Sequence, residues 1–374
     1  MAFLGISEFK HFVGVVEDRF DPEKLGRLRV RCLGIHTSDK NKIASSDLPW
    51  ASVLLPTTSA GISGLGQSPS FIVEGAWVWG YFRDGNGLMQ EMVIVGTLPG
   101  RPAELGKTAS GFYDPNNRLN ENGEPTGVSV YPKEFAEPDT NRLAVNDLEK
   151  EHSSLTARKA ARLENIPTAD FDEVGSNIAA SDTDNWSQPA ITYNAVYPYN
   201  HVFESESGHI REYDDSFTID EDGIRTNHYR IHERHSSGTS YEIDTAGNRI
   251  DLNMASYFNI TQKDNKHYIK GNSDVTIDGR HKVFINKSGI ADNNYDIQVG
   301  PNANVNIQVD NGNLNVVTKT GQFNFDVGAD FNCNVAGNYN LNVQGNETKT
   351  VEGSTTHNTT GSTTIRGRTI DLNP

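Results

Sequence analysis

The 374-residue sequence has few cysteines, no long apolar run and little positive charge, and each shortage excludes a class of protein. Its two cysteines, Cys32 and Cys333, lie in regions of different character, so we expect unpaired thiols in a protein assembled in a reducing cytoplasm. No apolar run reaches about 18 residues, and no charged-then-apolar leader opens the chain. We therefore expect neither a permanent membrane span nor secretion by a signal peptide.

Positive charge is outnumbered throughout. The chain has 33 Lys and Arg against 49 Asp and Glu, a formal net charge of −16. This balance argues against nucleic acid as a partner, because phosphate binding needs clustered basic residues. Hydrophobic residues make up 35% of the chain, which is low for one compact enzyme domain and suits a chain that is part globular and part repeat.

The sequence does contain an eight-residue repeat towards its C-terminus. Small residues recur at Gly321, Ala329, Gly337, Gly345, Gly353 and Gly361. Two positions earlier, most copies carry a valine (Val327, Val335, Val343, Val351), and the last copy carries Thr359. Apolar and polar residues alternate in between, which predicts strand. Each unit should therefore be one short strand plus one corner that needs a missing Cβ or a positive φ.

The length of this unit decides the architecture. At about 3.3 Å per strand residue, eight residues cover only one side of a triangular prism. A single chain would leave its backbone groups without hydrogen bonds and its apolar row exposed to water. Three identical chains wound around one axis would pair the backbone groups and bury the apolar row. We predict an intertwined homotrimeric β-helix, a triangular prism of the solenoid kind.

The N-terminal region, residues 1–105, is predicted to be a small closed β-barrel of the oligonucleotide-binding (OB) type. The strand candidates are Phe12–Glu17, Arg27–Leu33, Trp50–Leu55, Ala76–Phe82 and Met92–Thr97. Arg27, Arg29 and Arg31 alternate with apolar residues and form one basic face. This face either binds an anion or nucleic acid, or is a solvated or protein-docking surface. The absence of interleaved aromatics favours the second interpretation.

The rest of the chain divides into two further regions. Residues 106–194 are predicted to comprise a loop, one short helical stretch over Arg142–Glu164 and a linker. Thr140 or Asn141 is the expected N-cap of the helix. Residues 195–374 are predicted to be the β-helical spike, beginning with strands such as Thr239–Asp244 and Arg249–Asn253. The apolar row changes parity near Asp310–Asn313 and again near Gly321, so we expect irregular corners there. The predicted fold class is all-β.

Three blocks of sequence resemble the baseplate central spike proteins of contractile-tailed myophages. The first comprises Phe12–Arg19, Asp21-Pro22 and Leu25–Arg31, and the second runs from Tyr197 through Gly208-His209 to Asp214-Asp215. The Val-x-Gly octads are similar to the intertwined needle of that family and to the valine–glycine repeat spikes of type VI secretion. The resemblance implies a virion protein of the tail baseplate, assembled in the host cytoplasm.

The function that the resemblance implies is mechanical. A homotrimer docked on the baseplate hub ring protein would pierce the host outer membrane when the sheath contracts. The first alternative is a spike like those of type VI secretion. The second alternative, a polysaccharide-degrading trimeric tail spike, is disfavoured because the octads have few carboxylates and little exposed aromatic surface.

Well-known members of this family carry a lysozyme domain between barrel and needle, with a Glu as general acid and an Asp partner. Here about 60 residues separate Tyr131 from Ala190, too few for a glycosidase domain of about 150 residues. The carboxylates available there, Glu149, Glu151, Glu164, Asp170 and Asp172, have no cleft to raise a pKa. We therefore predict no catalytic residue and no enzymatic activity.

Histidines supply the candidate metal ligands. His228, His232 and His235 are close in sequence, but in a strand His235 points away from the other two, so a surface role is favoured over zinc. Within the octads, Cys333, Glu347, Lys349 and His357 share the parity of the valines. Three copies of His357 around a trimer axis would hold an axial ion; otherwise His357 lies near a corner and reaches solvent. We expect no other cofactor.

The C-terminal residues Ile370, Asp371, Leu372, Asn373 and Pro374 keep strand character and should present open strand edges. Open edges pair with other chains, so a small spike-tip capping protein is the expected partner there.

Overall fold

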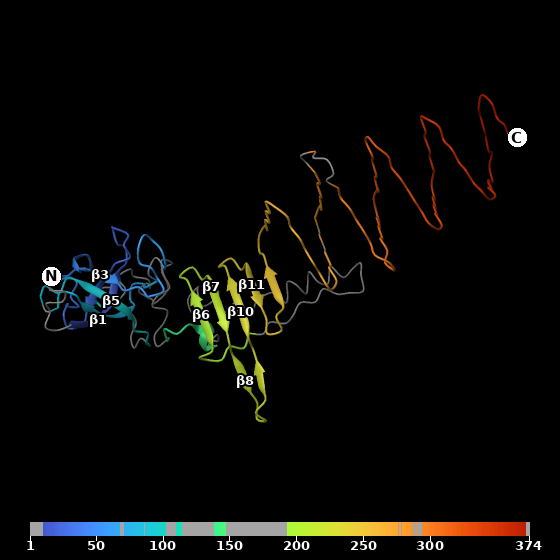
Figure 1. The fold of residues 1–374 in the computed structure, drawn as a ribbon. Helices are drawn as coiled ribbons and strands as arrows, with labels where there is room; N and C mark the ends of the chain where they lie inside the picture. The colour runs from blue at the N-terminus through green and yellow to red at the C-terminus, as the bar shows by residue number, and fades with distance from the viewer. Residues whose placement is uncertain are drawn as a thin grey trace. The chain divides into compact units, whose positions relative to one another are not determined.

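The computed structural model describes residues 10–67, 71–85, 87–101, 110–113, 138–146, 193–275, 277, 279–286, 289 and 294–371 (Figure 1). The chain separates into two compact units, Met1–Arg280 and His281–Pro374. Within the described ranges, no helix is long and apolar enough to cross a membrane.

The N-terminal part of the first unit is a closed five-stranded barrel. Its strands are β1 (Lys10–Asp18), β2 (Leu28–Cys32), β3 (Trp50–Val53), β4 (Trp77–Phe82) and β5 (Met92–Thr97), and a 3-10 turn (Ser45–Asp47) precedes β3. The order around the barrel is β1-β2-β3-β5-β4, with β3 and β5 parallel and the other pairs antiparallel. All five predicted strands are confirmed, because period-two alternation and clear turn residues mark them in the sequence.

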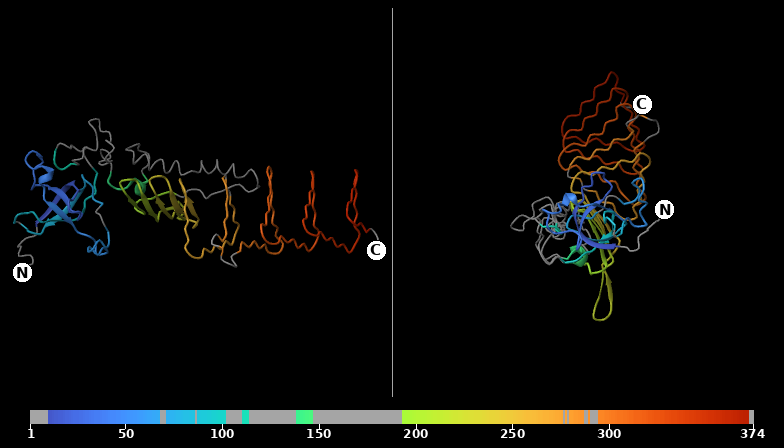
Figure 2. Two further views of the ribbon diagram at one scale, coloured as in Figure 1. Left: turned by 90° about the horizontal axis from the view of Figure 1, so that it is seen from above. Right: turned by 90° about the vertical axis from the view of Figure 1, so that its left-hand side faces the viewer.

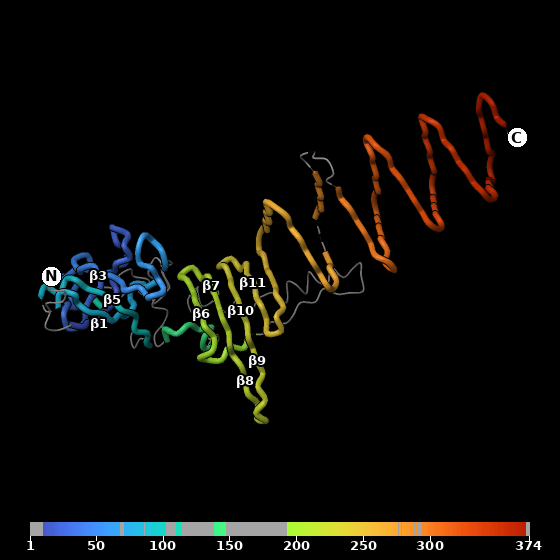
Figure 3. Tube along the Cα trace, viewed as in Figure 1, coloured from blue at the N-terminus to red at the C-terminus, as the bar shows by residue number. Residues whose placement is uncertain are grey.

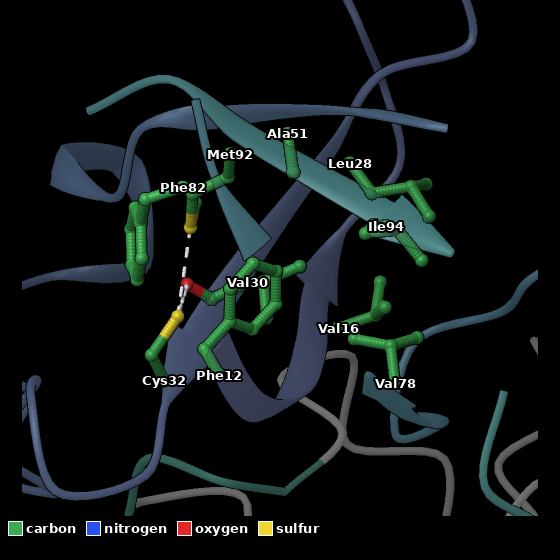
Figure 4. Close-up of a cluster of buried hydrophobic side chains, with 10 residues drawn as sticks. All are labelled: Phe12, Val16, Leu28, Val30, Cys32, Ala51, Val78, Phe82, Met92 and Ile94. Atoms are coloured by element: carbon green, nitrogen blue, oxygen red, sulfur yellow. Dashed lines mark hydrogen bonds between the residues drawn. The ribbon is translucent and has the colours of Figure 1, made fainter. Parts of the chain in front are cut away.

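The barrel is filled by one apolar cluster (Figure 4). Its buried members are Phe12, Val16, Leu28, Val30, Cys32, Ala51, Val78, Phe82, Met92 and Ile94. The Phe12 and Phe82 rings lie 5.2 Å apart, and the Cys32 sulfur lies 3.5 Å from the Met92 sulfur. Gly80 is required in this wall, because a Cβ there would lie 2.1 Å from the carbonyl oxygen of Val93.

A single helical turn, α1 (Arg142–Val145), follows. The Asn141 side chain caps it by accepting a hydrogen bond from the Leu143 backbone N–H at 2.9 Å, as predicted for this N-cap. This turn ends at Val145, because Asn146 adopts the left-handed conformation, so the predicted helix is interrupted there. Residues 147–164 lie outside the described residues.

The C-terminal part of the first unit is an antiparallel five-stranded sheet in the order β12-β11-β10-β7-β6 (Figure 1). Its strands are β6 (Asn200–Glu204), β7 (Ile210–Asp214), β10 (Arg230–Arg234), β11 (Ser240–Ile243) and β12 (Arg249–Leu252). A separate hairpin of β8 (Phe217–Ile219) and β9 (Arg225–Asn227) projects beyond the end of this sheet (Figure 3). The predicted strands at 239–244 and 249–253 are confirmed by β11 and β12.

The second unit has a different character. Among its described residues no strand is assigned, and every described residue from 294 to 371 is exposed. The backbone runs as straight segments joined by sharp bends (Figure 2). Within residues 294–370, an apolar row is therefore exposed and the backbone forms no assigned strand.

Candidate functional site: the octads and the charged surfaces

The octads are the most regular feature of the second unit. The backbone bends at Gly328-Ala329, Ala336-Gly337, Gln344-Gly345, Glu352-Gly353 and Thr360-Gly361, successive bends being eight residues apart. The same spacing occurs earlier in the chain, with bends at 254–255, 262–263 and 270–271. The bends at 301–302, 310–312 and 319–321 are separated by longer intervals, and the apolar row changes parity at the second and third of them.

The valines of successive octads occupy equivalent environments. Val327, Val335, Val343 and Val351 are 45%, 48%, 42% and 45% exposed. Such uniform half-exposure of a β-branched side chain indicates one repeated apolar row that is open on one side.

The expectation that each bend requires a missing Cβ or a positive φ is wrong for a single chain. Gly337, Gly345, Gly353 and Gly361 have no left-handed φ, and a Cβ added to any of them would meet nothing within 4 Å. Among the glycines of the repeat, only Gly321, with φ of +143°, has the positive φ that we expected at each corner. Nothing in the described part of a single chain therefore requires glycine at these four bends.

The other octad candidates lie in the same open segment. His357 and Cys333 are exposed, and no group of three or more metal-ligating side chains occurs in the part of the chain that the structure describes. Ile370 and Asp371 are also exposed, whereas Leu372, Asn373 and Pro374 lie outside the described residues.

The arginine row of the barrel is not the basic face that alternation predicted. Arg31 is completely buried, and its guanidinium donates to both carboxylate oxygens of Glu17, at 2.7 and 3.0 Å. Its remaining donors reach the carbonyl oxygens of Thr37 and Ile43. The alternation places Arg31 correctly on the outer side of β2, but the neighbouring loops cover that side.

The other two arginines are also neutralised. Arg27 makes a bidentate pair with Asp21, at 2.7 and 3.0 Å, and Arg29 lies 3.5 Å from Asp18. Both guanidinium groups stack against Trp50, 5.8 and 4.5 Å from the ring centre. An aromatic ring is therefore present among the arginines, which the sequence pattern did not show. Because each cation already has a carboxylate, the row fits a structural role better than anion binding.

These contacts change the ionisation of the acidic partners. Burial by itself would raise the pKa of Glu17, but hydrogen bonds from Arg31, the Ser45 hydroxyl and the Phe112 backbone N–H bring that pKa below its ordinary value. The Arg27 side chain, with backbone N–H groups of Glu23, Arg27 and Leu25, holds the pKa of Asp21 far below its ordinary value. Both carboxylates are therefore charged and fixed in place at neutral pH.

A distant segment is attached to this buried pair. The Phe112 backbone N–H donates to Glu17 at 2.9 Å, and the Gly111 N–H donates to the Ser38 carbonyl at 2.8 Å. A Cβ at Gly111 would lie 2.3 Å from the Arg31 Nε, so glycine is needed for this approach. The pair thus fastens residues 110–113 to the barrel wall.

The sheet buries a charged network that the sequence did not reveal. On one face, Arg230 lies 3.0 Å from Glu212 and 3.1 Å from Glu242, and the His232 Nδ1 lies 3.2 Å from Glu212. The Asn200 amide donates to Glu212 at 3.2 Å and to the Leu143 carbonyl of α1 at 3.0 Å. The opposite face exposes Phe203, Tyr213 and Ile231.

The surface role predicted for His232 is therefore wrong. Its side chain is 1% exposed, because β10 turns it onto the charged face next to Glu212. His235 is exposed, and its ring lies 4.5 Å from that of His209. The Nε2 atom of His228 is hydrogen-bonded to the side chains of Asn194 and Thr218. The three histidines do not converge on one point. Acidic and basic residues alternate in β7 and β10, and this pattern was the only sequence signal for the buried charged face. It did not indicate which face of the sheet is covered.

Comparison with known proteins agrees with the barrel and with the resemblance. Residues 34–189 match the family described as the Gp5 N-terminal OB domain. Over 305 residues the chain is 35% identical to Protein Gp5 of Vibrio phage KVP40, which covers 74% of this chain and 65% of that protein. Over 132 residues it is 42% identical to the pre-baseplate central spike protein Gp5 of Enterobacteria phage T4, covering 30% and 22% of the two chains.

A closed five-stranded barrel together with this family match defines an OB-type barrel protein. The predicted resemblance to baseplate central spike proteins is confirmed by the two relatives. The chain spans less than two thirds of the length of either relative.

Proposed function

We propose that this protein is the structural spike of a contractile phage tail baseplate, acting as a homotrimer. Its organisation follows the three predicted regions: a docking barrel (1–105), a connecting segment (106–194) and a spike (195–374). Both relatives are phage Gp5 proteins, which favours a phage spike over a secretion spike.

The observation that carries this proposal is the octad segment, in whose described residues no strand is assigned. All its described residues are exposed, and valines recur in it every eight residues as one half-exposed apolar row. Three copies wound around one axis would pair the backbone groups and cover the valines. The glycines support the same arrangement, because open space at a repeated glycine is suited to the close approach of a second backbone.

The barrel is proposed to dock on the baseplate hub ring protein. Its outer surface over β1 and β4 presents Trp77 and Trp79, 41% and 37% exposed, with the His11 ring stacked 5.2 Å from Trp79. Exposed tryptophans are the side chains that most often contribute strongly to protein interfaces. At the other end of the chain, residues 370–374 would accept the small capping tip protein through open strand edges.

The spike is proposed to pierce the host outer membrane by mechanical force, without catalysis. This part of the proposal is supported by spacing: the OB-family match extends to residue 189, β6 begins at Asn200, and about 60 residues separate Tyr131 from Ala190, against about 150 for a glycosidase domain. The carboxylates Glu149, Glu151, Glu164, Asp170 and Asp172 lie outside the described residues, so their lack of a catalytic role remains part of the proposal.

The test is the solution mass by light scattering, before and after treatment with SDS at room temperature. We expect a species of three times 41.2 kDa that survives the detergent. Intertwined strands paired along their whole length should dissociate very slowly. A monomer before detergent would overturn the trimeric spike.

A further inference from the structure

The open row of the octads changes character abruptly along the segment. In phase with the valines, three successive octads carry Phe323, Phe325 and Val327, then Phe331, Cys333 and Val335, then Tyr339, Leu341 and Val343. The next octad carries Glu347, Lys349 and Val351, and the one after it carries Thr355, His357 and Thr359. A row that is apolar through three octads thus becomes charged in the fourth and polar in the fifth.

Glu347 and Lys349 belong to one straight segment and to the valine side of it. Bends at Gln344-Gly345 and Glu352-Gly353 enclose both residues. They precede Val351 by four and two positions, so strand periodicity directs all three side chains to the same side. Val351 is 45% exposed, close to the 42% of Val343 in the apolar octad before it. Whatever covers the valines must therefore also accommodate these two charges.

A second copy of the chain is the occupant that meets this requirement. Threefold symmetry would bring three Glu347 and three Lys349 to one level inside the trimer. Three lysines alone would be unpaired cations next to an apolar interior, which strongly destabilises a fold. Equal numbers of both signs on adjacent inward positions make that level neutral.

We propose that Glu347 and Lys349 form a ring of ion pairs between the three copies, at the boundary between the apolar and the polar interior of the octad segment. The ring rests on the proposed function, since a single chain leaves both side chains exposed. This ring of ion pairs is the contact through which the three copies would recognise one another at that level.

The experiment uses the full chain and the lifetime of its SDS-resistant trimer at a fixed temperature. Removing one partner of a buried ion pair is far more harmful than replacing both by apolar groups. We expect Glu347→Gln and Lys349→Met each to shorten that lifetime by about tenfold or more. The double variant Glu347→Leu/Lys349→Leu should restore it to the wild-type value or beyond. Glu352→Gln, at the bend of the same octad, is the matched control and should leave it unchanged.

The outcomes separate the ring from the trimer. A trimer indifferent to both single changes, or a double variant that loses the sum of the two effects, overturns the ring and leaves the trimer intact. Stabilisation by inorganic phosphate that is independent of Glu347 would instead assign Lys349 to a bound anion, and would also overturn it. A single variant that fails to trimerise supports the ring if the double variant assembles. A monomeric wild-type chain overturns the proposed function itself.

Discussion

Glu17 and Arg31 form a completely buried bidentate ion pair in the wall of the barrel, with both side chains 0% exposed. The Glu17 Oε1 lies 2.7 Å from the Arg31 Nε, and its Oε2 lies 3.0 Å from Nη2. Because Glu17 also accepts hydrogen bonds from Ser45 and Phe112, this pair joins β1, β2 and two loops.

Glu17→Gln should therefore destabilise the barrel by about 3 kcal/mol or more, since it leaves the Arg31 guanidinium buried without its counter-charge. Urea unfolding followed by tryptophan fluorescence measures this, because Trp50, Trp77 and Trp79 all lie in the barrel. Glu23→Gln is the control, as the Glu23 side chain is 64% exposed and should shift the midpoint little. Equal midpoints for the two variants would contradict the structural role of the pair.

Asp21 should make barrel stability depend on acid. Hydrogen bonds from Arg27 and from backbone N–H groups hold its pKa well below the ordinary value. A lowered folded-state pKa adds stability that is fully present above the unfolded value of about 3.9 and is lost as the pH falls through the folded-state pKa. The difference in urea midpoint between wild type and Asp21→Asn should be large at pH 7 and should shrink below about pH 4. Exposed Asp47 supplies the control substitution, Asp47→Asn, which should show no such trend.

Arg230 should be the most sensitive position of the sheet. Arg230→Met leaves Glu212 and Glu242 buried without their shared cation, which should cost about 3–5 kcal/mol. Hydrogen exchange of peptides from β7 and β10 should accelerate strongly. Arg211→Met, on the exposed face and with a 55% exposed side chain, should leave that exchange almost unchanged. Similar protection in both variants would show that the network does not stabilise the sheet.

Gly345→Ala tests whether another chain approaches the bend. An added Cβ meets nothing within 4 Å in one chain, so the substitution should not harm the isolated fold. In the proposed trimer it should reduce the yield or the SDS resistance of the assembled species. The control is Gln344→Ala at the neighbouring bend residue. Gln344 already has a Cβ, so this substitution adds no atom at the bend. A fully stable Gly345→Ala trimer would argue against close packing at this corner.

The two thiols report on burial at both ends of the chain. Burial raises the pKa of Cys32 to about 12, so it should not react with a thiol reagent at pH 8 until the barrel unfolds. Cys333 is exposed in one chain but shares the inward parity of the valines. In the assembled trimer it should be protected, and unfolding should release two reactive thiols per chain. Rapid labelling of Cys333 in an SDS-resistant trimer would show that this row faces outward. The variant Cys333→Ser is the control, because labelling that disappears in it belongs to Cys333.

Much of the local structure was predictable because it depends on neighbouring residues. Alternation and turn residues gave the barrel strands, and Asn141 was a predictable cap, because both are short-range effects. The surface assignments of Arg31 and His232 were wrong, because alternation defines two faces without saying what covers each. Residues 37–45 and residues 110–113, together with Glu17, cover Arg31 on β2. Likewise, α1 lies on the charged face of the sheet.

The sequence by itself determined the period of the chain: the eight-residue repeat, its bends and its valine row arise from side-chain size and alternation at each position. Only the tertiary structure decided which charges are buried and with which partners they pair. Glu17 with Arg31 and Glu212 with Arg230 meet across strands that are separated along the chain. Their stability depends on removal from water and on hydrogen-bond geometry, and both are properties of the folded arrangement and not of local sequence.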